Sequence, residues 1–261
     1  MDPKKIIAII PARSGSKSIK DKNIKILGKK PLLAWSIESC LKSKLISKVY
    51  VSTDSNKYAK IAKQFGSVDI LFRPKKISGD FSTDYQMIKH AIESINYDYE
   101  YIVHIRPTTP LRKTKDLNNA IKSFINSKYT SLRAVHEMSE TSYKTVEINN
   151  RGALIPLKNI KLTIDEINAP RQKFNKTYNP NGVIDIYKKS FIVKNKKLFG
   201  NNVQAFKTAY SQEIDNKDDF KYMEFLCKKK IIKTKNITIS TSIPAPGTTK
   251  LMNKLRKYES R

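Results

Sequence analysis

The sequence contains few of the residues that build cysteine and histidine sites. Its 261 residues include two cysteines, Cys40 and Cys227, and three histidines. The cysteines lack a metal-binding spacing and are too few for a disulfide framework, so we expect ordinary thiols in a reducing cytoplasm. His90 and His104 fall inside a predicted helix and a predicted strand. Neither a cysteine nor a histidine is therefore placed like a catalytic nucleophile.

Glycine is also scarce, which excludes two common nucleotide-binding motifs. No two of the eight glycines have the G-x-G spacing of a dinucleotide fingerprint. Gly15 is followed five residues later by Lys20 and not by the Gly-Lys-Ser/Thr of a Walker A loop.

Long apolar runs are missing as well. No segment approaches the roughly 20 apolar residues of a transmembrane helix. The first apolar run follows MDPKK, is short and ends at Pro11, unlike a secretory signal. We therefore expect no membrane partner and a cytoplasmic protein. Hydrophobic residues still make up 39% of the chain, which is enough for one large core.

Acidic residues are few, and the formal net charge is +28. Such a charge raises the possibility of nucleic-acid binding. However, only 9 of the 51 basic residues are arginine, the lysines are spread along the chain, and no zinc-finger or aromatic RNA-binding pattern occurs. We expect a solvated lysine-rich surface that attracts anionic substrates, without a nucleic-acid partner. A basic nucleic-acid binder on a degenerate enzyme fold is the alternative from another functional class.

Short apolar runs alternate with segments of helical period. The run IIAII is typical of a strand buried on both faces of a parallel sheet. Strands are predicted at 6–10, 48–53, 68–72, 101–105 and 131–135, and helices at 31–43, 58–65, from 84 onward and at 117–124. This alternation predicts an α/β fold. Its ligands would lie at the carboxyl ends of the strands, where Arg13, Asp54 and Arg73 fall.

The loop after the first predicted strand has the composition of a phosphate site. It reads RSGSK from Arg13 to Lys17, with Lys22 and Asn23 shortly after. Small residues allow backbone N–H groups to converge, and the basic side chains add positive charge. The loop therefore favours a polyphosphate ligand, although a basic loop in a lysine-rich protein could also be structurally unremarkable.

This stretch, IPARSGSKSIKDKN, resembles the N-terminal signature of the acylneuraminate cytidylyltransferases, also called CMP-sialic acid synthetases. The resemblance covers about residues 6–226. It implies a Rossmann-like nucleotidyltransferase fold with a mostly parallel sheet flanked by helices. The implied catalytic residues are Arg13, Lys22 and Asp215. The implied nucleotide-binding residues are Arg13, Ser16, Lys17, Lys22, Asn23, Arg73 and Ser82. Asp84 aligns with the same loop, but an N-cap role in the following helix is equally open.

The sugar side shows two departures from the family pattern. RPTTPLR places Arg106 where the family usually has glutamine, and Asp185 stands where tyrosine is common. An acidic group would repel an acidic sugar, so we expect Arg106 and Asp185 to be a compensating pair. The implied sugar-binding residues are Arg106, Lys144, Arg171, Asn181, Asp185 and Phe199. A solvated lysine at 144 and core packing of Phe199 are the open alternatives. For Arg112, a surface cation and a buried salt-bridge partner both stay open.

A pair of carboxylates further along suggests a metal site. Glu213 and Asp215 are two residues apart, so on an extended backbone both side chains point to one side. Such oxygen ligands, together with substrate phosphates, suit Mg²⁺. The family pattern is D-I-D where this chain has E-I-D. Asp218 and Asp219 are expected to cap the next helix.

The resemblance also predicts the domain organisation and the reaction. Residues 1–230 would form the cytidylyltransferase-like domain, with an excursion at about 140–180 that mediates a homodimer. Residues 231–261 would form a basic tail. The expected substrates are CTP and an acidic nonulosonic sugar, such as sialic, legionaminic, pseudaminic or ketodeoxyoctulosonic acid, for cell-surface polysaccharide synthesis. A related nucleotidyltransferase that uses another sugar or base is the nearest alternative.

Overall fold

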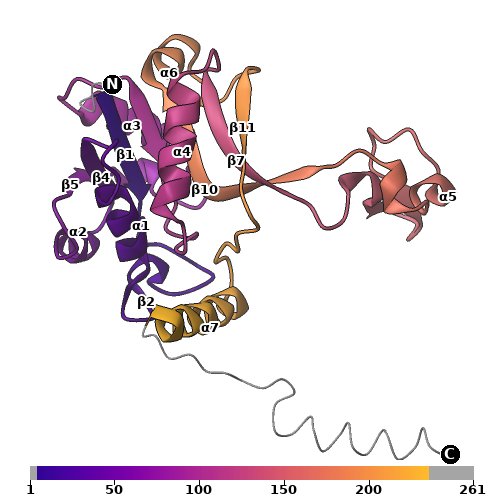
Figure 1. Cartoon of the computed structure of the whole chain (residues 1–261), viewed down its shortest axis with the longest axis horizontal. Helices are drawn as coiled ribbons and strands as arrows, with labels where there is room; N and C mark the ends of the chain where they lie inside the picture. Colours follow the sequence, from indigo (N-terminus) through magenta and orange to yellow (C-terminus); the bar gives the residue numbers. More distant parts are fainter. Residues whose placement is uncertain (1–4, 235–261) are drawn as a thin grey trace, which may run out of the picture. The chain divides into compact units, whose positions relative to one another are not determined.

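The computed structural model describes residues 5–234 and contains a central seven-stranded sheet (Figure 1). In sheet order the strands are β11 (Val203–Lys207), β7 (Ser131–Glu137), β10 (Tyr178–Lys188), β6 (Tyr101–His104), β1 (Ile6–Pro11), β4 (Lys48–Thr53) and β5 (Asp69–Phe72). β10 runs antiparallel to both of its neighbours, and the other pairings are parallel. The predicted mostly parallel α/β fold is confirmed.

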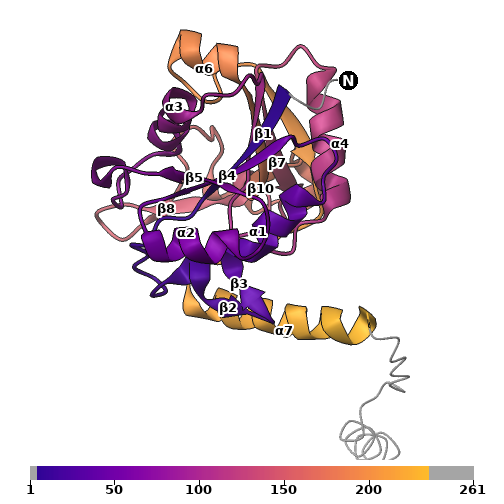
Figure 2. The same cartoon turned by 90° about the vertical axis from the view of Figure 1, so that its left-hand side faces the viewer.

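Helices cover both faces of this sheet (Figure 2). They are α1 (Leu32–Leu41), α2 (Asn56–Lys63), α3 (Asp84–Ser94), α4 (Thr114–Ile125) and α6 (Lys189–Asn195). Successive side chains of a strand point to opposite faces. In β1, Ile6, Ala8 and Ile10 accordingly join the core under α1, α2 and α4, while Ile7 and Ile9 join the core under α3 and α6. This is why the strand is apolar throughout.

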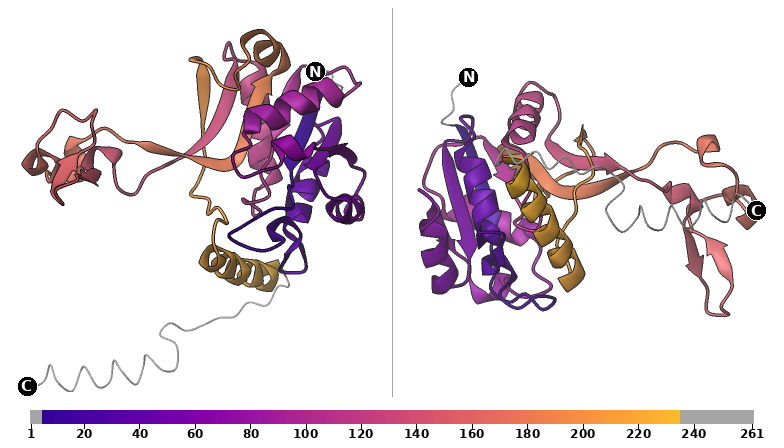
Figure 3. Two further views of the ribbon diagram at one scale, coloured as in Figure 1. Left: turned by 180° about the vertical axis from the view of Figure 1, so that it is seen from behind. Right: turned by 60° about the horizontal axis from the view of Figure 1, so that its bottom comes forward.

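Between β7 and β10 the chain leaves the sheet and forms a separate lobe, which we call the arm, residues 138–177 (Figures 1 and 3). The arm contains the hairpin of β8 (Val146–Ile148) and β9 (Leu154–Pro156), the short helix α5 (Ile164–Ile167), and two 3₁₀ turns, Ser142–Lys144 and Arg171–Lys173. It lies where the sequence predicts an excursion. The register of β10 on β7 shifts between Pro180 and Asp185, so a bulge marks the arm's return to the sheet.

Short elements surround the first loop and end the described chain. A 3₁₀ turn (Lys22–Ile24) and a two-stranded ribbon, β2 (Ile26–Leu27) and β3 (Lys30–Pro31), follow β1. A further 3₁₀ turn, Lys75–Ile77, precedes α3. The last helix is α7 (Lys217–Thr234), and the chain divides into two compact units between Met223 and Glu224. Most of the expected basic tail, from residue 235 onward, lies outside the described residues. None of the described helices could span a membrane.

Two helix starts differ from the sequence-based expectations. Thr83, and not Asp84, caps α3, because the Thr83 hydroxyl accepts the Gln86 N–H in a reciprocal capping box. At α7 the side chain of Asn216 accepts the N–H groups of Asp218 and Asp219. Asp219 completes this second box by accepting the Asn216 N–H. The carboxylate of Asp84 is therefore available for another role.

Candidate active site

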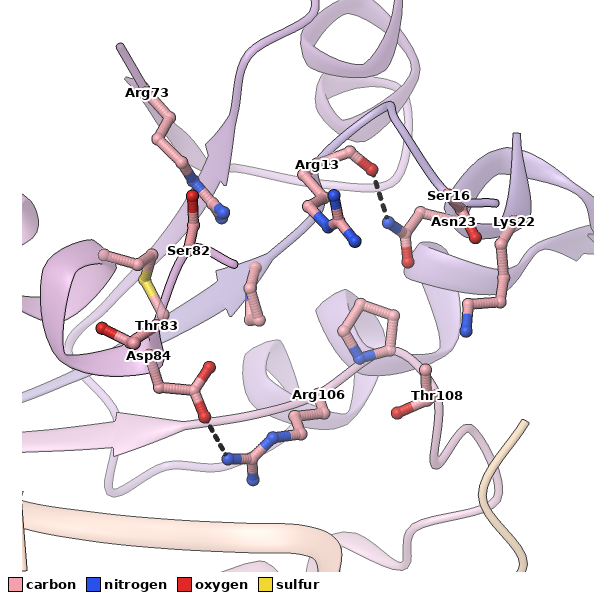
Figure 4. A pocket seen from close by; sticks show the side chains of 13 residues that line it. Arg13, Ser16, Lys22, Asn23, Arg73, Ser82, Thr83, Asp84, Arg106 and Thr108 are labelled. Atoms are coloured by element: carbon pink, nitrogen blue, oxygen red, sulfur yellow. Dashed lines mark hydrogen bonds and ion pairs between the residues drawn. The ribbon is translucent and has the colours of Figure 1, made fainter. Parts of the chain in front are cut away.

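A cavity of about 220 Å³ opens at the carboxyl ends of β1 and β6 (Figure 4). It is lined by Pro11, Arg13, Ser16, Lys22, Asn23, Arg73, Ser82, Thr83, Asp84, Met87, Arg106, Pro107 and Thr108. Six of the seven predicted nucleotide-binding residues belong to this set, together with Arg106 from the predicted sugar side. Residues from three loops thus converge on the edge of the sheet where a ligand was expected.

The loop after β1 is held in place by its neighbours. Asp54, just past β4, accepts hydrogen bonds from the N–H and the hydroxyl of Ser14, at 2.8 and 3.0 Å. Asn23 donates its side-chain N–H to the carbonyl of Arg13 at 2.9 Å. Asp21 adopts a left-handed backbone conformation and accepts the hydroxyl proton of Tyr58 at 3.0 Å. The loop is therefore pre-shaped before a ligand arrives.

The cations of this loop are fixed by different partners. Arg13 forms an ion pair with Asp80 at 3.0 Å, and Lys17 pairs with the same carboxylate at 2.6 Å. Lys17 is highly exposed and does not line the cavity. Arg73 is buried and donates to the hydroxyl and the carbonyl of Ser52, at 3.2 and 3.1 Å. Burial, together with the charge of Arg13, lowers the pKa of Arg73.

Lys22 connects the first loop to the segment that carries the two predicted metal ligands. Its ammonium donates to the carbonyl of Ile214 at 2.9 Å. Burial lowers the pKa of Lys22, against the opposing charges of Asp215 and Glu213. The two carboxylates therefore lie close enough to Lys22 to affect its pKa. The Ile214 N–H in turn donates to the carbonyl of Thr108, a residue of the cavity wall, at 2.9 Å.

Glu213 and Asp215 flank the buried Ile214, on a segment that is neither helix nor strand. Glu213 is half-buried and Asp215 is exposed. A Cβ at Gly182 would lie 2.4 Å from Oε1 of Glu213 and 2.6 Å from Oγ1 of Thr109, so Glu213 packs directly against the Gly182 backbone. No cluster of three or more Asp, Glu, His or Cys ligands occurs in the described residues.

The sugar side of the cavity contains a charged network centred on Arg106. Its guanidinium contacts Asp185 and Asp84, each at 2.6 Å, and Figure 4 shows the second of these contacts. Asp185 is fully buried behind Arg106 and does not line the cavity. Burial raises the pKa of Asp185 despite Arg106, whereas Asp185 and Asp84 raise the pKa of Arg106 against the effect of burial. The predicted Arg106–Asp185 contact is present.

Two further basic residues differ from the sequence-based expectations: Arg133 has no predicted role, and Arg112 matches neither of its two alternatives. Arg133 lies 3.7 Å from Asp185, although nothing in its strand pattern marks it as a partner. Arg112 is neither a surface cation nor a salt-bridge partner. It is buried, and it donates to the carbonyls of Val183, Gly182 and Arg106. Arg112 therefore ties the loop after β6 to the backbone of β10.

The remaining predicted sugar residues lie away from the cavity. Lys144 donates to the carbonyl of Ala169 in the arm, and Arg171 pairs with Glu137 at 3.2 Å. Asn181 is buried and donates to the hydroxyl of Thr208 at 3.0 Å. Phe199 packs edge-on against Tyr187 and under Arg133, which agrees with the core-packing alternative.

His104 is buried in the same network. Burial lowers its pKa to about 3, so the ring is neutral at pH 7. Its Nδ1 lies 3.3 Å from the hydroxyl of Tyr187. A neutral, enclosed imidazole agrees with the structural role expected from its position inside a strand.

Comparisons with known proteins find relatives that are named as cytidylyltransferases or CMP-sugar synthases. A family model described as cytidylyltransferase matches residues 7–240. An N-acylneuraminate cytidylyltransferase of Escherichia coli is 35% identical over 87% of this chain and 53% of its own length. A CMP-N,N'-diacetyllegionaminic acid synthase of Campylobacter jejuni is 30% identical over 88% of this chain and 98% of its own. The chain thus spans about half the length of the E. coli relative.

Solved structures show the same fold at low sequence identity. A CMP:2-keto-3-deoxy-manno-octonic acid synthetase complexed with CTP aligns with a TM-score of 0.65 and 16% identity, over 87% of this chain and 99% of that one. A 4-diphosphocytidyl-2C-methyl-D-erythritol synthase from Anaerococcus prevotii has a TM-score of 0.61 and 13% identity, over 87% and 97%. The matched family model, together with the relatives from E. coli and C. jejuni, establishes that the chain belongs to the cytidylyltransferase family.

Proposed function

We propose that the protein joins CTP to an acidic nonulosonic sugar and releases pyrophosphate. The observation that carries this proposal is the convergence of Arg13, Lys22 and Arg73 with the neutral donors Ser16 and Asn23 around one cavity. Cationic and neutral donors in a preformed cavity suit a nucleoside triphosphate. Relatives named for the activation of sialic and legionaminic acids support the nature of the second substrate. We also propose that the reaction takes place in the cytoplasm.

The proposed reaction needs positioning and charge neutralisation more than covalent chemistry. The anomeric hydroxyl oxygen of the sugar attacks the α-phosphorus of CTP, and the bond from that phosphorus to the bridging oxygen breaks. Pyrophosphate leaves with the bond electrons, and the hydroxyl proton passes to solvent. Arg13 and Lys22 neutralise the charge that grows on the phosphates. Asp54 and Asn23 fix the backbone of the loop, and the Ile214 carbonyl holds the ammonium of Lys22.

We propose Mg²⁺ as the cofactor, held by Asp215 and Glu213 together with the triphosphate. The donor set fits, because Mg²⁺ is usually bound by one or two carboxylates plus substrate phosphates and waters. The negative charges of both carboxylates raise the pKa of Lys22, and Lys22 lines the cavity. When bound, the ion would polarise the phosphoryl oxygens and the attacking hydroxyl. Glu213 and Asp215 do not themselves line the cavity, but the backbone of Ile214 between them contacts Lys22 and Thr108, which do.

Gly182→Ala tests whether Glu213 must keep its position. The added methyl group would overlap the Glu213 carboxylate and the Thr109 hydroxyl. Since the side chain of Glu213 is flexible, we expect it to turn away, so that half-maximal activity needs roughly 10-fold more Mg²⁺. Mg²⁺ titrations of pyrophosphate release would measure this change. Gly152→Ala serves as a comparison that strains the backbone at a positive φ of 77° but brings no atom within 4 Å of its added Cβ, so it should lose stability without changing the Mg²⁺ requirement. An unchanged Mg²⁺ requirement in Gly182→Ala would argue against Glu213 as a ligand.

We propose that the arm forms a homodimer contact. Ile148, Leu154, Ile155 and Ile164 are all exposed on it, with exposed fractions of 73%, 54%, 38% and 40%. Exposed apolar residues on a lobe outside the sheet favour an interface. Ile148 and Leu154 face each other across the hairpin, so replacing both with lysine should convert a dimer into monomers in light scattering. A monomeric unmodified protein would contradict the proposal.

The sugar-binding roles of Lys144 and Arg171, both on the arm, stay predictions.

The direct test is pyrophosphate release with Mg²⁺, in which four nucleoside triphosphates are combined with a panel of acidic nonulosonic sugars. We expect a signal that requires both CTP and one such sugar. Activity with another base would change the assigned nucleotide and leave the reaction intact. Activity with a sugar outside the nonulosonic class would change the assigned sugar. The presence of Arg106 and Asp185, where the family usually has glutamine and tyrosine, would explain that change. No release from the folded protein, combined with salt-sensitive DNA binding, would favour the nucleic-acid alternative.

A further inference from the structure

Asp80 occupies an unusual position relative to the proposed phosphate site. Its two carboxylate oxygens contact two different cations of the loop after β1. Oδ1 lies 3.0 Å from Nη1 of Arg13, and Oδ2 lies 2.6 Å from Nζ of Lys17. Arg13 lines the cavity, and both cations are predicted to hold the triphosphate. An anionic group of the protein is thus bound where an anionic ligand is expected.

A carboxylate in this position resembles a phosphate in charge and in acceptor geometry. Both present oxygen acceptors to guanidinium and ammonium donors, and neither donor can accept a hydrogen bond. The N–H groups of Arg13 and Lys17 that bind Asp80 cannot bind phosphate oxygens at the same time. Lys17 and Arg13, in that order, lower the pKa of Asp80 by hydrogen bonding, so the carboxylate is ionised at neutral pH.

The loop that carries Asp80 is anchored at its ends and weakly held at its tip. Ile77 packs in the core at one end, and Thr83 caps α3 at the other. Between them, Phe81 has an exposed fraction of 99%, so its ring does not anchor the tip by packing. Besides Asp80, the Ser78 carbonyl contacts Arg13, at a long distance of 3.4 Å. Displacing the tip would therefore cost little beyond the two ion pairs.

We propose that Asp80 is a phosphate place-holder, an autoinhibitory contact that the triphosphate must displace from Arg13 and Lys17 before it binds. This inference rests on the proposed function of the cavity as a nucleoside triphosphate site. In the absence of nucleotide, Asp80 keeps two like charges from repelling each other and holds the site closed to weakly charged ligands. A ligand with several phosphate charges competes best for the two cations.

Calorimetric titration of the full-length protein with CTP, cytidine and inorganic tripolyphosphate tests the proposal. Asp80→Asn removes the competing charge, so it should bind CTP and tripolyphosphate about 3- to 10-fold more tightly, the range expected for losing two partly exposed ion pairs. Cytidine carries no phosphate, so its affinity should not change. Asp80→Glu keeps the charge and should behave like the unmodified protein.

Asp69→Asn is the matched control. Asp69 is the first residue of β5 and pairs with Lys48 at 4.0 Å, so it lies at the amino ends of the strands, whereas the cavity lies at their carboxyl ends. This variant makes the same change in net charge away from the site. The place-holder is refuted if Asp80→Asn binds both phosphate ligands no more tightly than Asp69→Asn, or more weakly. Tripolyphosphate binding without CTP binding would refute the proposed function while the comparison of variants still decides the role of Asp80. Failure of both phosphate ligands to bind would refute both proposals.

Discussion

Asp215→Asn is expected to reduce kcat for nucleotidyl transfer about 100-fold or more while leaving the thermal midpoint nearly unchanged. Asp215 is exposed, and the bond that it makes to Asp219 comes from its backbone N–H, which the variant keeps. The substitution therefore removes a charge near Lys22 without removing a packing contact. Steady-state pyrophosphate release and a thermal melt on the same preparation would measure both quantities.

Asp218→Asn is the appropriate control for this prediction. Asp218 lies three residues away, is highly exposed and pairs with Lys221 at 2.9 Å. The Asp218→Asn variant removes the same charge from the same part of the chain. Asp218 is not among the residues whose charges are found to affect the pKa of Lys22. Mn²⁺ binding in the presence of CTP, followed by electron paramagnetic resonance, gives a readout that does not depend on turnover. A variant that loses activity but binds Mn²⁺ normally would show that Asp215 has another role, and a collapsed fold would show that it is structural.

Arg106→Gln is expected to destabilise the fold by roughly 3 kcal/mol at pH 8. This value is at the low end for removing one partner of a buried ion pair, because Arg133 still lies 3.7 Å from Asp185. The variant leaves the fully buried carboxylate of Asp185 without its contact at 2.6 Å. Chemical denaturation at several pH values would measure the free energy of unfolding.

The pH dependence of this variant has a definite sign. Burial already raises the pKa of Asp185, and the loss of Arg106 removes the largest opposing effect. The folded variant would then keep a proton on Asp185 at pH values where the unfolded chain has released it. Because the folded state binds more protons, its stability falls as pH rises. The deficit relative to the unmodified protein should therefore be smaller at pH 5 than at pH 8.

A double variant separates charge compensation from simple loss of a side chain. Arg106→Gln with Asp185→Asn removes both charges and keeps similar shapes, so it should recover most of the stability lost in Arg106→Gln alone. Asp185→Asn alone should lower the free energy of unfolding only slightly, because Arg106 keeps its ion pair with Asp84 at 2.6 Å. A double variant that is no more stable than Arg106→Gln would disprove the compensating pair.

The sequence alone was sufficient to predict the parallel core and the basic loop at its carboxyl edge. An unbroken apolar run such as Ile6–Ile10 requires burial on both faces, because successive side chains of a strand point to opposite sides. Polar residues directly after such strands gather at the carboxyl edge whatever the strand order. This local rule explains why Arg13 and Arg73 lie together in the cavity.

Only the tertiary structure decided which residues these side chains contact, because the contacting residues are far apart in the sequence. β10 lies beside β6 with Asp185 opposite His104, and this register brings Asp185 to Arg106 across 79 residues. Lys22 reaches Ile214 across 192 residues, and Arg13 reaches Asp80 across 67. Periodicity reveals which face of an element is buried, but it carries no information on which strands are neighbours. The order and register of the strands therefore decided which charges meet at the site.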